Sequence, residues 1–269
     1  MNKKNNIDWH ACGNKNFKLL FNYNKRPKAE KNFDIIGKYN RQFYQCKICD
    51  HIYAKHFFKI KNIYKKSYLD LTYKNTEGIS KRFEQITNLP IKKSDNKNRA
   101  LRIYDFLKKK KTNLLDIGSG IGVFLYEMKK KGLDVQGLDL DKRYALFLKK
   151  KGIKINVSEV SKLKIKKKFN LITLNKVLEH VENPIQFLKN SIKFLGKDGI
   201  MYIEVPDTNA KLKGKFSGEF CLDHLQIYSI QSLINITKSV GLSPLRVERI
   251  IEPSNKYTVF GFFNLSINK

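Results

Sequence analysis

The chain has few of the features that mark membrane or exported proteins. Its 269 residues contain no apolar run of about 18 residues, the length that a membrane-spanning helix needs. The first residues, MNKKNNIDWH, lack the apolar centre of a signal peptide. We therefore expect a cytoplasmic protein. In that compartment the four cysteines are expected to be thiols or metal ligands rather than disulfides.

Arginine and acidic residues are sparse in a chain of high positive charge. The 54 Lys and Arg residues outnumber 24 Asp and Glu, which gives a net charge of +30, yet only eight of the 54 are arginine. Arginine is the side chain suited to bidentate contacts with bases and phosphates. Because lysine, asparagine and isoleucine are all abundant, we interpret the charge as codon bias of an AT-rich genome. Nucleic-acid binding is the alternative.

A glycine-rich turn follows an apolar strand near the middle of the chain. The strand ends at Gly118, and Gly120 and Gly122 follow before helical spacing resumes. Side chains at these positions would keep the backbone from approaching a nucleotide, and glycine tolerates the positive φ that such turns often need. A second strand over 134–140 carries Asp139 about 20 residues after the turn, where a carboxylate can accept hydrogen bonds from a ribose. The pattern predicts a pocket for an adenosine-containing ligand.

The segment LDIGSGIG at 115–122 resembles the first motif of class I S-adenosylmethionine (SAM)-dependent methyltransferases, in which an acidic residue precedes the first glycine. Three later segments agree with that family in order and distance: FNLITLNKVLEHVENP at 169–184, DGIMYIEVPD at 198–207 and DHLQIYS at 223–229. The resemblance covers about residues 95–250 and follows the branch that methylates small molecules and sugars. It implies an α/β fold with a Rossmann-like seven-stranded sheet. Such a sheet is mostly parallel, with an antiparallel last strand and helices on both faces.

The resemblance also indicates which residues bind SAM. They are Asp116, Gly118, Ser119, Gly120, Gly122, Asp139, Leu140 and Asn175. In open α/β sheets the ligand lies beyond the carboxyl ends of the strands, so the loops after the first and fourth strands should face each other. The candidates for catalysis on these loops are His180 and His224, because imidazole takes up a proton near neutral pH. Each could instead be a structural hydrogen-bonder that positions its loop.

Lys176 argues against a metal ion beside SAM. Family members that methylate catechol-like or RNA-ribose hydroxyls with a divalent ion have a glutamate three residues before a Glu-His pair, which here is Glu179-His180. Lys176 stands at that position in this chain, where it would repel the ion and removes an oxygen ligand. We therefore expect a reaction in which the protein chiefly aligns nucleophile, methyl carbon and sulfur.

The first 60 residues hold three of the four cysteines and are rich in aromatic side chains. Cys46 and Cys49 have the two-residue gap with which two thiolates bind one tetrahedral zinc, and Cys12 is a third ligand candidate. A cysteine partner for Cys12 is missing because Trp9 occupies its place. The candidates for the fourth ligand are His10, His51 and His56, of which we choose His10. This segment resembles the cysteine-bearing N-terminal segment of some bacterial sugar methyltransferases, and a metal-free remnant is the alternative.

These patterns divide the chain into a cysteine-containing module at 1–60, a helical lid at 61–112 and a SAM-binding domain at 113–269. The predicted function is methyl transfer from SAM to oxygen or carbon of a small-molecule or sugar acceptor. The main alternative is an RNA methyltransferase that uses the lysine-rich surface. Against it, the loop NKVL at 175–178 lacks the Asn/Asp-Pro-Pro-aromatic motif of base-amino methylation and a cysteine for attack on a pyrimidine. A non-catalytic SAM-binding interaction module is the third hypothesis.

Overall fold

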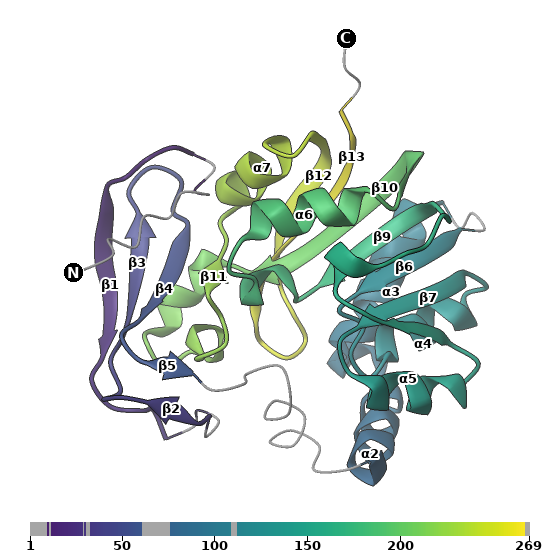
Figure 1. Cartoon of the computed structure of the whole chain (residues 1–269), viewed down its shortest axis with the longest axis horizontal. Coiled ribbons are helices and arrows are strands. Elements are labelled where there is room, and N and C mark those ends of the chain that lie inside the picture. Colours follow the sequence, from purple (N-terminus) through teal and green to yellow (C-terminus); the bar gives the residue numbers. More distant parts are fainter. Residues whose placement is uncertain are drawn as a thin grey trace.

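The computed structural model describes residues 10, 12–28, 30, 33–60, 76–108 and 112–266. Within these residues a large sheet of seven strands stands beside a four-stranded sheet (Figure 1). The order of the large sheet is β12-β13-β10-β9-β6-β7-β8. Its strands are β6 (Asn113–Ile117), β7 (Asp134–Asp139), β8 (Lys154–Val157), β9 (Phe169–Asn175), β10 (Leu195–Pro206), β12 (Leu242–Ile251) and β13 (Tyr257–Leu265).

The direction of the strands confirms the predicted fold class. Strands β6 to β10 pair in parallel, and β13 runs antiparallel to both β10 and β12. The strand order reverses between β6 and β9, which pair through Leu114 and Leu171. This reversal places the loops after β6 and β9 side by side at one edge of the sheet, the position at which open α/β sheets bind ligands.

Helices cover both faces of the large sheet (Figure 1). One face packs against α2 (Thr76–Thr87), α3 (Asp95–Phe106), α4 (Val123–Lys130) and α5 (Lys142–Lys149), and the other against α6 (Pro184–Ile192) and α7 (Ile230–Lys238). Ser229 caps α7, since its side chain accepts a hydrogen bond from the Ser232 amide. Of the predicted lid at 61–112, residues 61–75 lie outside the described part. Helices α2 and α3 bury Ile79, Phe83 and Ile103 in the core, so they pack as ordinary core helices.

The four-stranded sheet joins the N-terminal segment to a short strand that lies far along the chain. It contains β1 (Phe17–Tyr23), β3 (Arg41–Cys46), β4 (Ile52–His56) and the short β11 (Gln226–Ile227), while β2 (Ile35–Ile36) and β5 (Lys59–Ile60) form a separate pair. In β11, Gln226 pairs with Tyr53 and Ile227 with Ile52. The sheet formed by residues 17–56 is therefore completed by a segment that immediately follows His224.

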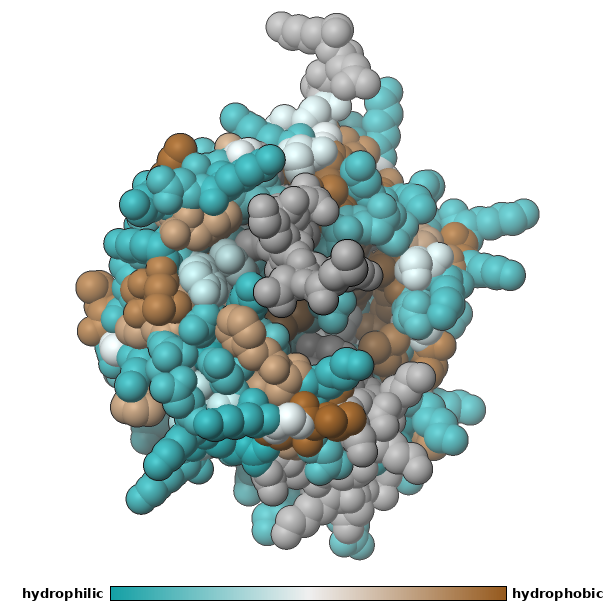
Figure 2. Space-filling view, turned by 60° about the vertical axis from the view of Figure 1, so that its left-hand side comes forward, coloured by the Kyte–Doolittle hydropathy of each residue, from teal (hydrophilic) through white to brown (hydrophobic). Residues whose placement is uncertain are grey.

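Figure 2 shows one face of the molecule, on which hydrophilic side chains predominate and hydrophobic residues form small groups. Such a mixture is ordinary for a folded domain, because polar side chains never cover a surface completely. Within the described part of the chain, the helices are too short or too polar to cross a lipid bilayer.

Candidate active site

A cavity of about 780 Å³ opens at the carboxyl ends of β6, β7 and β9. Its volume is that of an ordinary site for a small ligand or cofactor. Four of the predicted cofactor residues line it: Gly118, Gly120, Asp139 and Leu140. Other lining residues include Tyr144, Ser158, Glu159, Val160, Ser161, Lys176, Val177, His180, Asn183, Gln186, Phe187 and Asn190. The α6 residues of this list, Gln186, Phe187 and Asn190, were not predicted to line the cavity. Any helix that covers a sheet has apolar residues on one face and polar residues on the other, so this pattern does not mark a cavity.

The glycine turn has the conformation that its sequence predicted. Gly118, Gly120 and Gly122 have φ angles of 76°, 52° and 72°, in the left-handed region that side chains disfavour. A Cβ atom at Gly118 would lie 2.5 Å from Val177 Cγ2, whereas one at Gly120 would meet nothing within 4 Å. The Gly120 backbone therefore borders open space in the cavity, which is the cradle that a nucleotide ligand requires.

Asp139 connects the glycine turn to the end of β7. Its Oδ2 accepts a hydrogen bond from the Gly120 amide at 2.8 Å, and its Oδ1 accepts one from the Leu140 amide at 2.7 Å. Burial raises the pKa of this carboxyl group, and the backbone amides oppose the shift. The Asp141 amide is a third donor, to Oδ1 at 3.2 Å. Because a carboxylate has about four lone-pair sites, about one remains for a ribose hydroxyl in the cavity.

The other four predicted cofactor residues, Asp116, Ser119, Gly122 and Asn175, lie outside the cavity lining. The Asp116 side chain accepts hydrogen bonds from Thr173 Oγ1 at 2.6 Å and from Asn175 Nδ2 at 2.7 Å. Burial raises the pKa of Asp116 to about 7. This group links β6 to β9 directly behind the cavity, and its contact with a cofactor stays a prediction.

His180 and His224 lie together although they are far apart in the sequence, and the His180 ring bonds to the carbonyl of Asp223, 43 residues away. His180 ends the 3₁₀ helix η4 (Leu178–His180), and its ring centroid is 4.9 Å from that of His224. The Nδ1 atoms lie 2.7 Å from the Asp223 carbonyl and 2.8 Å from the Glu219 carbonyl, respectively. Because a carbonyl only accepts, each Nδ1 donates, and Nε2 is the basic nitrogen. Burial, with a smaller contribution from His180, lowers the pKa of His224 to about 3, so His224 is neutral at physiological pH.

Glu179 completes a compact group with the two histidines. One ligand atom from each of the three residues lies within 4.8 Å of the others. Glu179 is fully buried, and neither of its carboxylate oxygens has a hydrogen-bond partner in the described chain. Burial raises its pKa, while the charges of His180 and Lys176 oppose the shift.

A buried ionic cluster below the cavity was not predicted from the sequence. Glu204 on β10 accepts hydrogen bonds from Arg99 Nε at 2.9 Å and from Tyr202 Oη at 2.7 Å, and Arg102 Nη1 lies 3.1 Å from it. Arg102 Nη2 also lies 3.8 Å from Glu252. The spacing of Arg99 and Arg102, one turn apart on a helix that packs in the core, is the signal that indicates a buried acidic partner.

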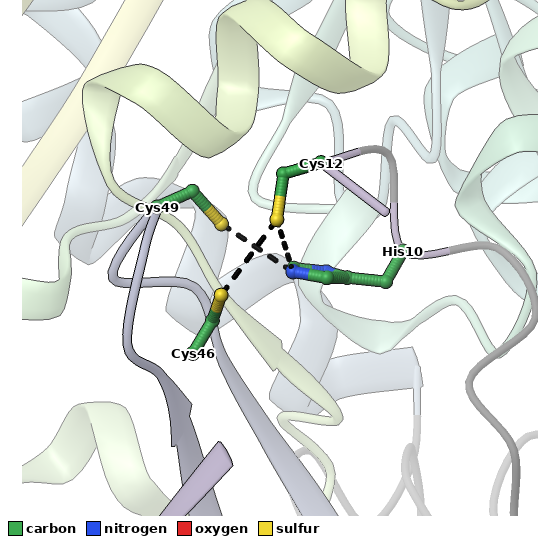
Figure 3. Close-up of side chains that lie close together, drawn as sticks. All are labelled: His10, Cys12, Cys46 and Cys49. Carbon is green, nitrogen blue, oxygen red and sulfur yellow. Dashed lines mark hydrogen bonds between the residues drawn. The ribbon is translucent and has the colours of Figure 1, made fainter. Parts of the chain in front are cut away.

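The four predicted metal ligands of the N-terminal segment converge on one point (Figure 3). Cys12 Sγ lies 2.9 Å from His10 Nε2 and 3.7 Å from Cys46 Sγ, and Cys49 Sγ lies 3.4 Å from His10 Nε2. Trp9 lies outside the described residues. The other two candidates for the fourth ligand have different surroundings, since His51 Nε2 lies 2.8 Å from Gln226 Oε1 and His56 stacks on Phe58.

Hydrogen bonds connect this cysteine and histidine cluster to the segment after His224. The Ser229 hydroxyl donates to the Cys49 carbonyl, and His51 bonds to Gln226 on β11. Leu225 forms two further links, because its amide donates to the Glu179 carbonyl at 2.7 Å and its carbonyl accepts from the Ala54 amide at 2.9 Å. The cluster and the two active-face loops are thus parts of one hydrogen-bonded arrangement.

Comparison with known proteins gives a consistent result. A family model described as a methyltransferase domain matches residues 87–247. The ubiquinone biosynthesis O-methyltransferase of Pelagibacter ubique is 32% identical over 166 residues, which are 60% of this chain and 64% of that protein. The chain thus spans less than two thirds of the length of that relative.

Two solved structures show the same fold. The 1,6-didemethyltoxoflavin-N1-methyltransferase of Burkholderia thailandensis, with bound S-adenosylhomocysteine and 1,6-didemethyltoxoflavin, has a TM-score of 0.54 at 14% identity over 71% of this chain and 87% of that chain. A SAM-dependent methyltransferase of Clostridium acetobutylicum has a TM-score of 0.53 at 14% identity over 71% of this chain and 99% of that chain. Because the family model covers more than half of the residues and the fold agrees, the chain belongs to the class I SAM-dependent methyltransferases.

Proposed function

We propose that this enzyme transfers the methyl group of SAM to an oxygen or carbon atom of a small-molecule or sugar acceptor. The observation that carries the proposal is the pair of neighbouring histidines, His180 and His224, at the edge of the cofactor cavity. Their Nε2 atoms are basic, and His180 lines the cavity with Gly120 and Asp139. The arrangement supports proton removal from an acceptor that lies between the cavity and the loop before β11.

Each part of the site has a distinct role in this proposal. When bound, SAM supplies an electrophilic methyl group on a sulfonium, so no activation of the methyl donor by the protein is required. The Gly118 to Gly122 turn offers backbone to the cofactor, and Asp139 accepts a hydrogen bond from its ribose. His180 or His224 takes the proton that an acceptor hydroxyl or carbon acid loses, although the pKa of about 3 makes His224 a weak base near neutral pH.

The activities for which similar proteins are named support a small acceptor. The relatives include a ubiquinone biosynthesis O-methyltransferase, and the solved structures include a glycopeptide N-methyltransferase and the toxoflavin-precursor enzyme. The cysteine-bearing N-terminal segment favours a sugar acceptor through its resemblance to sugar methyltransferases. RNA is the alternative acceptor, for which the net charge of +30 is the supporting observation.

We further propose that His10, Cys12, Cys46 and Cys49 bind a structural zinc ion. A tetrahedral zinc with Zn–S bonds of about 2.3 Å holds its sulfurs about 3.8 Å apart. The Cys12 and Cys46 sulfurs are 3.7 Å apart, and three thiols with one imidazole are a common zinc donor set. The ion would hold the N-terminal segment in place below the segment that contains β11.

Transfer of labelled methyl from SAM tests the proposed function. The wild-type chain is incubated with catechols, nucleoside-diphosphate sugars and total RNA, beside a His180→Ala/His224→Ala double variant as the matched control. We expect uptake into one class of small molecule and about 100-fold or greater loss of uptake in the double variant. Uptake into RNA alone at physiological salt would support the alternative acceptor. Binding of SAM without transfer to any compound would favour the non-catalytic module.

A further inference from the structure

Lys176 belongs to the buried ionic cluster and also lines the cofactor cavity. We define the Glu204 cluster as Arg99, Arg102, Lys176, Glu204 and Glu252. Among these described residues, Lys176 is the member that lines the cavity. Its side chain is 25% exposed, compared with 7% for Arg99 and 14% for Arg102.

The charges of the Glu204 cluster depend on the protonation of its carboxyl groups. Three cationic side chains face Glu204 and Glu252, and Glu179 is a third buried carboxyl group near Lys176. Burial and the neighbouring Glu204 raise the pKa of Glu252 to about 7, which reduces its negative charge near neutral pH. Burial alone would raise the pKa of Glu204, but the charges of Arg99, Lys176 and Arg102 and the Arg99 hydrogen bond together outweigh it and lower the pKa, so Glu204 stays ionised. Protonation of one carboxyl group leaves positive charge in excess, which is costly when buried unless an anion approaches it, and Lys176 offers the approach from the cavity.

The backbone holds Lys176 in an uncommon conformation that aims its side chain at this cluster. Its φ is 58°, in the left-handed region that favours glycine, and its amide donates to the Glu204 carbonyl at 2.9 Å. Lys176 Nζ donates to Thr258 Oγ1 at 2.6 Å and lies 3.8 Å from Glu204 Oε1. An ammonium has three donors, so donor capacity remains on a side chain whose residue lines the cavity. Strained backbone that the surrounding fold maintains is characteristic of functional positions.

The Lys176 charge acts on Glu179 and His224, which lie where the acceptor is proposed to bind. Burial is the main cause of the shifted pKa values of Glu179 and His224, and the Lys176 charge lowers both. Burial lowers the pKa of Lys176 itself, and Glu204 and Glu179 oppose that shift. The charged groups that act on Lys176 are Glu204 on β10, Glu179 on η4, Arg99 on α3 and Glu252 after β12, and the Lys176 charge in turn acts on His224.

We propose that the Lys176 ammonium binds the acceptor oxygen that carries negative charge during methyl transfer. The inference rests on the proposed function and adds the class of acceptor, a compound with an alkoxide, phenolate or enolate oxygen. An ammonium at that oxygen stabilises charge that develops as the reaction proceeds, and a preorganised donor of this kind contributes strongly in a site that excludes water.

The step balances for both kinds of acceptor. In O-methylation, the hydroxyl proton passes to Nε2 of His180 or His224 and the oxygen forms a bond to the methyl carbon. The carbon–sulfur bond breaks, and sulfur keeps the electron pair, which leaves S-adenosylhomocysteine. In C-methylation, the proton leaves the acceptor carbon, Lys176 faces the enolate oxygen, and the new bond joins the two carbons.

Lys176→Met, Lys176→Arg and the surface control Lys238→Met test the inference. The probe is the compound of the acceptor panel with the highest wild-type rate. Lys176→Met should lower kcat by about 100- to 1,000-fold, as removal of one oxyanion donor does in other enzymes. The SAM Kd should change by less than about 2-fold, and the rate profile should move to higher pH, because the acceptor loses the cation that lowers its pKa. Lys176→Arg should restore part of the rate.

The outcomes separate this inference from the proposed function. If the wild type and Lys238→Met transfer methyl and Lys176→Met matches them at every pH, the inference is wrong and the function stands. A weakened SAM Kd with unchanged kcat would assign Lys176 to the carboxylate of SAM and overturn the acceptor role. If the wild type methylates no compound, the proposed function and the inference both fail. Melting temperatures and the partial recovery in Lys176→Arg distinguish a chemical effect from loss of folding.

Discussion

Alanine at both His180 and His224 should lower the turnover of methyl transfer by about 100- to 10,000-fold, the usual effect of removing a general base. The rings are adjacent, and each Nδ1 donates to a backbone carbonyl, which fixes the orientation of both imidazoles at the edge of the cavity. Because Asp139 and the glycine turn lie on other loops, SAM affinity should stay near the wild-type value. The single variants should show which of the two histidines takes the proton.

Turnover, SAM affinity and melting temperature are measured together for the His180 and His224 variants. His56→Ala is the matched control, because His56 is also half-buried but stacks on Phe58 in the N-terminal part of the chain. It should lower the melting temperature and leave turnover per folded enzyme unchanged. Near-normal turnover in both single variants and in the double variant would remove the histidines from the mechanism and leave alignment as the source of catalysis.

Protein prepared with zinc available should contain about one zinc ion per chain, and Cys46→Ser with Cys49→Ser should lose it. Both thiols point toward His10 and Cys12, with which they form the proposed zinc site (Figure 3). In small metal-binding modules the free energy of metal binding contributes directly to the stability of the fold. The double variant should melt at a lower temperature. It should still bind SAM, because the cofactor cavity is formed by the large sheet.

Methyl transfer should fall in the same cysteine variant, since Cys49 and His51 are bonded to Ser229 and Gln226 near His224. Elemental analysis measures the zinc content, calorimetry measures SAM binding, and the labelled-methyl assay measures methyl transfer. Cys221→Ser is the control for loss of a thiol, because Cys221 is absent from the cluster. Metal-free wild type with native stability and activity would identify the cysteines as a remnant.

Much of the fold could be predicted from local sequence patterns, because backbone conformation and strand length are set by residues that are close in the sequence. The glycines that follow β6 need positive φ whatever surrounds them, and β7 and β9 are recognisable as apolar segments of strand length. The positions of the three cysteines limited the candidates for the fourth zinc ligand to three histidines, of which His10 was chosen. The resemblance placed His180 and His224 on facing loops, although their separation in the sequence is large.

Other features depend on contacts between distant residues. Arg99 and Glu204 are 105 residues apart, and nothing near either of them specifies the other. From the sequence, Lys176 is recognisable only as a residue that stands where some related enzymes have a metal-binding glutamate. Its pairing with Thr258 and Glu204 exists only in the folded chain. Strand β11 has two residues, which is too short for a periodic signal, so its pairing with β4 was not predicted.

Calorimetric titration of SAM into the wild type, Asp139→Ala and Asp134→Ala tests the central claim most directly. Both aspartates lie on β7, but Asp134 is on the surface and pairs with Lys167, whereas Asp139 lines the cavity. We expect one SAM per chain, with Asp139→Ala weakening the Kd about 10-fold or more, since hydrogen bonds to a charged acceptor contribute about 1.5 to 3 kcal/mol. Asp134→Ala should bind as the wild type does. An unchanged Kd in a folded Asp139→Ala protein would contradict the assignment of this cavity to SAM.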